Sequence, residues 1–173
     1  MANNVPMRTS EASRRDACSG FTLMELCVTM AIALVMAAVS VPVIGSTLRA
    51  YKMNTAVAGV NSGILKTRYR AISAGYPFAL VMNKANSTLQ VQSDPANSGA
   101  FANVGLPIPI ASAPNMLGQN MTLVFRPGGA IQCPACTAAQ VDATGNWLIT
   151  LSYTAVPTET LTVSPYGQIT VTP

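Results

Sequence analysis

Two cysteines late in the chain have a spacing that supports chemistry, in the segment Cys133-Pro134-Ala135-Cys136. This spacing is typical of a redox dithiol, half of a zinc site, or a short structural loop. A redox pair is expected where a helix opens in a thioredoxin-like unit, whereas residues 131–140 lie between expected strands. A zinc site needs further ligands, and the sequence around this pair offers no histidine and no other cysteine. The pattern favours a disulfide. A reduced and inert pair is one alternative, and a redox or metal site is the other.

Few other residues could carry out acid–base chemistry. The 173 residues include no histidine, and only six are Asp or Glu. This composition excludes a Ser-His-Asp triad, a Cys-His nucleophile and an imidazole-ligated metal. Beyond Glu25 the only carboxylates are Asp94, Asp142 and Glu159. We therefore expect a protein that is not an enzyme and that holds no cofactor and no metal.

Positive charge gathers in one segment. Five Lys and Arg residues, and no acidic residue, occur between positions 49 and 70. Because a basic patch attracts phosphates, Lys66, Arg68 and Arg70 are candidate contacts for nucleic acid. A solvated helix face, or a face toward lipid headgroups, is the preferred interpretation, since the net charge of the whole chain is only +4.

A long uncharged segment comes before these residues. Residues 26–48 contain no charge over 23 positions, which as a helix would extend about 35 Å at about 1.5 Å per residue. Because a bilayer core is about 30 Å thick, the segment is long enough to span it. A buried core helix is one alternative. A cleaved signal peptide is the other, but it expects an apolar region of only about 7–15 residues.

The helical pattern continues beyond this segment. A spacing of three and four residues predicts an amphipathic helix that Gly75 and Pro77 end. Its expected packing stripe is Leu48, Tyr51, Thr55, Ala58, Ser62, Leu65, Tyr69 and Ile72. The two segments together predict one long helix. Pro42 lies within it and predicts a kink or local unwinding near residues 38–42.

The remainder of the chain predicts short strands. Alternating or β-prone runs occur at residues 77–83, 87–92, 121–126, 147–153, 160–163 and 168–172. Turn residues separate them at 84–86, 127–129 and 164–167. Residues 93–120 show little periodicity and are expected to form a long, functional or mobile loop. The fold class expected is α+β, with the long helix packed on a mainly antiparallel sheet.

The segment Gly20-Phe21-Thr22-Leu23-Met24-Glu25 resembles the processing site of type IV prepilins and type II secretion pseudopilins. The resemblance implies that a prepilin peptidase cuts between Gly20 and Phe21 and methylates the new amine of Phe21. It also implies three regions: a leader at 1–20, a transmembrane and filament-core helix at 21–48, and a head at 49–173. The first half of the long helix would thus span the bacterial inner membrane once, with the head in the periplasm.

Two residues of the helix gain a role from this resemblance. Glu25 becomes the fifth residue of the mature chain, where the family places a glutamate. A lone carboxylate in a membrane is unfavourable, so pairing with the Phe21 amine of a neighbouring subunit would favour assembly in one register. A Glu25 that headgroups simply hydrate is the alternative. Pro42 falls where many members carry a helix-kinking proline.

The head is similar to one branch of this family. Arg68 and Arg70 before the first strand, the run Phe125-Arg126-Pro127-Gly128-Gly129 and the final hairpin at 167–169 resemble the GspH/FimT group of minor pseudopilins and minor pilins. The resemblance implies a structural subunit of a type IV pilus or a type II secretion pseudopilus. Its partners would be the prepilin peptidase, other pilin or pseudopilin subunits, the inner-membrane assembly platform and membrane lipid. The alternative is a DNA-binding minor pilin that acts in DNA uptake, and a major pilin is a second alternative.

Overall fold

A computed structural model describes residues 21–110 and 116–173 of the chain. The expected leader, including Gly20, lies outside the described residues. The chain divides into two compact units, Met1–Val41 and Pro42–Pro173. The second unit contains all of the strands and is called the head below.

One helix, α1 (Leu23–Ala74), runs for 52 residues and belongs to both units. The single long helix that the sequence predicts is therefore confirmed. It ends as expected, because Gly75 adopts a φ of +75° that a glycine adopts readily, and Pro77 follows. From Phe21 to Ser40 every side chain is exposed. This part of α1 is long and apolar enough to cross a membrane.

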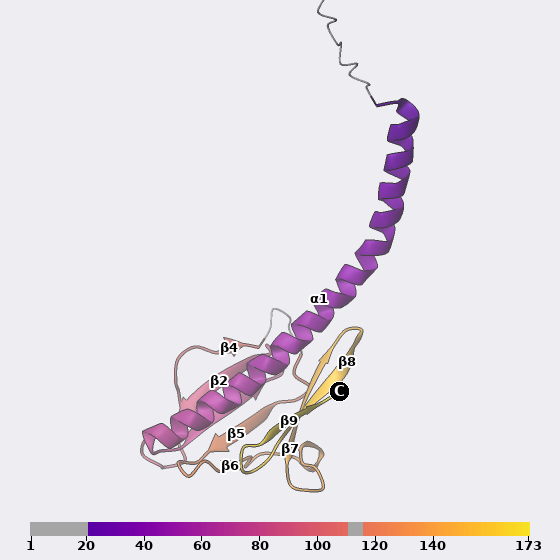
Figure 1. Ribbon diagram of the computed structural model, residues 1–173. Helices are drawn as coiled ribbons and strands as arrows, with labels where there is room; N and C mark the ends of the chain where they lie inside the picture. Colours follow the sequence, from indigo (N-terminus) through magenta and orange to yellow (C-terminus); the bar gives the residue numbers. More distant parts are fainter. Residues whose placement is uncertain (1–20, 111–115) are drawn as a thin grey trace, which may run out of the picture. The chain divides into compact units, whose positions relative to one another are not determined.

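Six strands of the head form the larger of two antiparallel sheets (Figure 1). They are β1 (Phe78–Asn83), β2 (Thr88–Ser93), β3 (Ala102–Asn103), β4 (Ile108–Pro109), β5 (Met121–Phe125) and β6 (Ile131–Gln132). The order across the sheet is β3-β2-β1-β5-β6, and β4 also pairs with β2. Strands β1 and β2 pair as a hairpin about the expected turn at 84–86, with Phe78 opposite Ser93 and Asn83 opposite Thr88.

The smaller sheet has the order β7-β8-β9. Its strands are β7 (Trp147–Tyr153), β8 (Val156–Val163) and β9 (Ile169–Thr172), and a short 3-10 helix, η1 (Ala138–Gln140), precedes β7. An isolated bridge between Leu117 and Leu151 connects the segment before β5 to this sheet. The head thus has two sheets where the sequence suggested one, and the α+β class is confirmed.

The expected long loop at 93–120 is partly wrong. Strands β3 and β4 form within it and both pair with β2. Ile110, Met116 and Leu117 are buried in the core. Two-residue strands lack the alternation that marks longer ones, so the sequence missed β3, β4 and β6. Residues 111–115 lie outside the described part.

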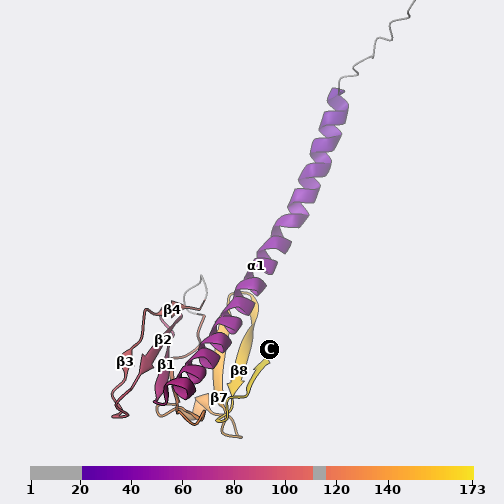
Figure 2. The ribbon, with the colours of Figure 1, turned by 60° about the vertical axis from the view of Figure 1, so that its left-hand side comes forward.

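The core lies between one face of α1 and both sheets. Figures 1 and 2 show the C-terminal part of α1 lying across them. The helix buries Met53, Ala56, Val60, Ile64, Thr67 and Ala71. It lies close to the larger sheet at Gly63, where a Cβ would be 2.7 Å from the Leu89 side chain. The small side chains on this face allow the close packing of helix on sheet.

The packing stripe expected from the sequence is therefore wrong. Its large members Leu48, Tyr51, Leu65, Tyr69 and Ile72 are exposed, and Tyr69 is 72% exposed. They lie on the side of α1 that faces away from the sheets. We call these five residues the outer stripe.

Candidate functional site

The first turn of α1 holds two of the expected site residues. Phe21 directly precedes Thr22, whose hydroxyl accepts a hydrogen bond from the Glu25 N–H at 3.2 Å. Thr22 is therefore the N-cap, and Glu25 occupies the third helical position. A carboxylate there also interacts favourably with the helix dipole. Glu25 thus has a local role in capping in addition to the expected role in assembly.

Cys27 and Pro42 are two further residues of interest in the apolar segment. Cys27 is an exposed free thiol on α1. The backbone is helical through Pro42, which begins the second compact unit. The kink expected at this residue stays a prediction.

The outer stripe adds apolar surface within the head. In the described part of α1, residues 43–74 bury one face against the sheets and leave the outer stripe exposed. Exposed apolar side chains are a feature of membrane and protein interaction sites. The helix therefore carries two apolar faces here, one that forms the core of the head and one that is available for another molecule.

The three candidate nucleic-acid contacts do not form one surface. Arg68 donates from Nε to the carbonyl of Gly129 at 3.0 Å, and its guanidinium lies directly against Gly167. It thus connects α1 to the β5–β6 turn and to the β8–β9 turn. Lys66 and Arg70 instead border a small apolar hollow on the side of the larger sheet. The sequence shows that these residues are charged, but it does not show that Arg68 connects α1 to two turns of the head.

The disulfide expected between Cys133 and Cys136 is present, with Cα atoms 5.4 Å apart. It closes the turn between β6 and η1, and both cysteines pack partly buried against the core. The pair precedes only a three-residue 3-10 helix, whereas a thioredoxin-like site needs a longer one. Its position is that of a structural staple.

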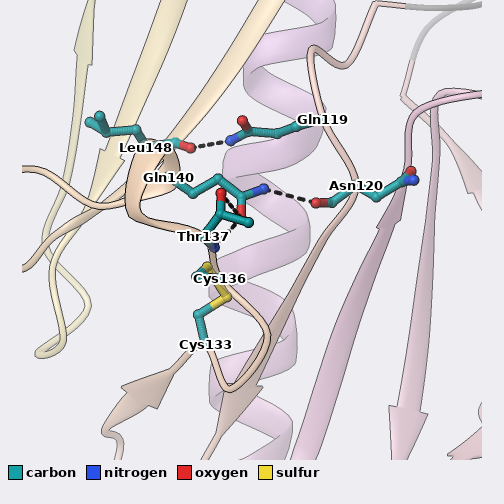
Figure 3. Close-up of a disulfide and its surroundings, with 7 residues drawn as sticks. All are labelled: Gln119, Asn120, Cys133, Cys136, Thr137, Gln140 and Leu148. Carbon is teal, nitrogen blue, oxygen red and sulfur yellow. Dashed lines mark hydrogen bonds between the residues drawn. A yellow bond between two sulfur atoms is a disulfide. The ribbon is translucent and has the colours of Figure 1, made fainter.

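A set of amide hydrogen bonds extends from this staple (Figure 3). The Gln140 side chain accepts from the Thr137 N–H at 2.8 Å and donates to the Asn120 carbonyl at 2.9 Å. The Gln119 amide donates to the carbonyl of Leu148 on β7. The Gln140 bonds fasten the loop to the segment before β5, and the Gln119 bond joins that segment to the smaller sheet. No periodic pattern in the sequence predicts these bonds.

The two aspartates of the head stabilise loops. Four donors, the Thr144 hydroxyl foremost, hold the Asp142 carboxylate, and together these bonds lower its pKa to about 2. Burial raises the pKa of Asp94, but hydrogen bonds from Gly99 and Ser98 outweigh it and lower that pKa. Within 21–110 and 116–173, no group of three His, Cys, Asp or Glu residues could hold a metal ion.

A comparison with known protein families, curated proteins and solved structures found no match to this chain. The most prominent feature of the described residues is the exposed apolar surface of α1.

Proposed function

We propose that this chain is a structural subunit, a minor pilin or pseudopilin, that assembles into a type IV pilus or a type II secretion pseudopilus. It carries out no reaction of its own and is a substrate of the prepilin peptidase. Its other partners are further pilin or pseudopilin subunits, the inner-membrane assembly platform and membrane lipid. The resemblance of residues 20–25 to a prepilin processing site supports this proposal.

The observation that carries the proposal is the exposed apolar surface of α1. Residues 26–40 are uncharged and exposed on every side of the helix, and the outer stripe continues apolar surface into the head. Apolar surface of this extent is unfavourable in water. Lipid can cover the first part before assembly, and the helices of neighbouring subunits can cover both parts in a filament.

The processing step gives the direct test. Intact mass and N-terminal sequencing of membrane-extracted protein should find Phe21 as the first residue, with one added methyl group. A Gly20→Leu variant should keep its leader, and Ser19→Ala is the matched control that should be cut normally. A mature chain that begins after residue 36 would instead indicate an ordinary signal peptide and would refute the assignment.

Incorporation gives the second test. Mature chain should appear in sheared filaments or pseudopili together with other subunits when the assembly platform is present. Without the platform it should remain in the inner-membrane fraction. Mature chain that stays in the membrane in both cases would contradict a role as a subunit and would leave a plain membrane-anchored protein.

A further inference from the structure

The face of the larger sheet that is turned away from α1 carries a hollow of about 280 Å³. It is lined by Val124 of β5, which pairs with Ala79 and Gln132 on the neighbouring strands. Side chains alternate between the two faces of a strand, and Leu123 and Phe125 on either side of Val124 belong to the core that α1 covers. Val124 therefore points away from α1. We call this cavity the far-face hollow.

Two segments that are distant in the sequence form walls of the far-face hollow. The loop after β2 contributes residues 97–99 and Phe101, and the turn that the disulfide closes contributes Pro134. Pro77, just before β1, adds a buried apolar ring. The hollow thus combines apolar surface with amide and hydroxyl groups, which is the usual composition of a binding site.

The buried Asp94 carboxylate holds the loop wall in place. Asp94 is 2% exposed, and its two oxygens accept hydrogen bonds from the Ser98 N–H at 3.1 Å and the Gly99 N–H at 2.7 Å. The Ser98 hydroxyl donates to the same carboxylate. Because these bonds fasten the loop without a ligand, binding does not carry the entropic cost of ordering it.

Arg126 supplies a positive charge at the far-face hollow. Its Nε donates to the side-chain oxygen of Gln132 at 3.2 Å, which orients the guanidinium. The two Nη groups can donate in parallel to the two oxygens of a carboxylate, a geometry that arginine forms readily. Among the described residues, Arg126 is the one cation that lines the hollow, and Asp94 is the one acid.

We propose that the far-face hollow binds the C-terminal end of another polypeptide. The terminal carboxylate binds the Nη groups of Arg126, and the last side chain lies against the apolar surface of Val124, Phe101 and Pro134. The amide nitrogen of Gln132 donates to the peptide backbone. Capture of a terminal carboxylate is one of the recurring modes of peptide recognition.

The charges and the size of the far-face hollow favour this ligand over others. One cation matches one carboxylate, whereas a nucleic acid requires several cations for its phosphates and Asp94 would repel a phosphate dianion. The volume of about 280 Å³ lies below the range of about 300–1,000 Å³ that is typical of small-molecule sites. The hollow therefore suits the end of a chain better than a cofactor-sized ligand.

The far-face hollow also lies away from the surfaces that the proposed assembly uses. The larger sheet separates it from α1, so packing of the outer stripe against neighbouring helices does not by itself cover it. The site would thus be available both before and after assembly. The inference goes beyond the proposed function and does not depend on it.

The test measures the fluorescence polarisation of labelled peptides with the full chain in detergent micelles. The probes are short peptides that carry an N-terminal fluorophore and end in Ala, Val, Leu or Phe, each made with a free C-terminal carboxylate and with a C-terminal amide. We expect at least one free acid to bind. Its amide should bind about ten- to a hundredfold more weakly, because hydrogen bonds to a charged group are the stronger ones.

Two variants and a matched control locate the site. Arg126→Gln removes the cation, and Gln132→Glu keeps the shape of the side chain but places a competing carboxylate beside Arg126. Both variants should abolish the preference for the free acid over the amide. Lys84→Gln removes one cation from the β1–β2 turn, outside the hollow, and should keep the preference. All three residues are exposed, so denaturant unfolding should be close to that of the wild type.

Several outcomes would overturn the inference. Equal binding of acid and amide would do so, as would a preference that survives in Arg126→Gln or a lack of binding by every peptide of the set. A peptide with an internal Glu and an amidated end that binds as well as the free acids would show that the hollow accepts acidic side chains and not chain ends. Displacement of the peptide by inorganic phosphate at the concentration at which the unlabelled peptide acts would show a general anion site, which also contradicts the assignment.

Discussion

Glu25 has a capping role and an expected assembly role, which two variants can separate. Its N–H donates to the Thr22 hydroxyl, and its side chain lies at the third helical position. Glutamine is also accepted at that position of a capping box but carries no charge. Glu25→Gln therefore removes the charge and keeps the local structure. Thr22→Ala removes the cap and keeps the charge.

The expected magnitudes differ enough to be distinguished. A charged side chain in the membrane interior costs about 2.5–3.5 kcal/mol on insertion scales, and pairing with the Phe21 amine of a neighbouring subunit would relieve most of this on assembly. Loss of that gain should lower incorporation about a hundredfold, at about 1.4 kcal/mol per tenfold. Loss of an N-cap costs about 1 kcal/mol, so Thr22→Ala should lower incorporation by about fivefold or less.

The assay is the ratio of mature chain in sheared filaments to mature chain in the membrane, measured by quantitative mass spectrometry. Both variants should first be shown to lose the leader normally, so that a processing defect is excluded. Incorporation of Glu25→Gln at the wild-type ratio would refute the charge pair. A deficit in Thr22→Ala alone would show that assembly depends on the helix cap and not on the charge of Glu25.

Three further predictions concern the head. Ile64→Ala should lower the free energy of unfolding by about 2–5 kcal/mol, because Ile64 is fully buried. Leu65→Ala, the neighbouring position on the outer stripe, should change it by no more than about 0.5 kcal/mol. Equal losses of stability in denaturant unfolding would contradict the assignment of the two faces. Thiol labelling of denatured, non-reduced protein should find Cys133 and Cys136 blocked. Replacement of both by Ser should lower the free energy of unfolding by less than about 3 kcal/mol, the value for a 15-residue loop, because the loop that this disulfide closes is very short. The pKa of Asp142 is lowered to about 2. The contribution of this carboxylate to stability is therefore complete above its unfolded pKa of about 3.9 and is lost as the pH falls toward 2. An Asp142 carboxyl resonance that titrates near pH 4 by NMR would show that the loop does not hold this carboxylate.

The sequence predicts the helix and most of the longer strands, although β8 begins at Val156 and not at 160 as expected. It does not predict the direction in which the helix packs. Residues 48–72 of α1 contain two stripes at helical spacing. The stripe with the larger side chains is the exposed one, and the buried stripe includes Ala56 and Ala71. Periodicity indicates that an apolar face exists and cannot identify what covers it. Because the exposed stripe carries the larger side chains, side-chain size is a misleading guide to the core here.

The roles of some site residues could be predicted from the sequence, and those of others could not. The disulfide could be predicted because its spacing and the lack of other ligands limit the alternatives. The use of Arg68 could not, because its partners Gly129 and Gly167 lie far along the chain and are brought to it only by the fold. The same holds for Lys66 and Arg70, which the fold brings to one hollow with Ile108 of β4.

The shared core of α1 and β8 sets the order in which the head can fold. Met53 lies near the start of the head and Val163 near its end, and both belong to one buried cluster. Contacts between such distant positions form late and slow the folding of a domain. If the chain is exported as proposed, the buried face of α1 would reach the far side of the membrane before the strands that cover it. A partly exported chain would then expose both faces of this helix, which favours aggregation.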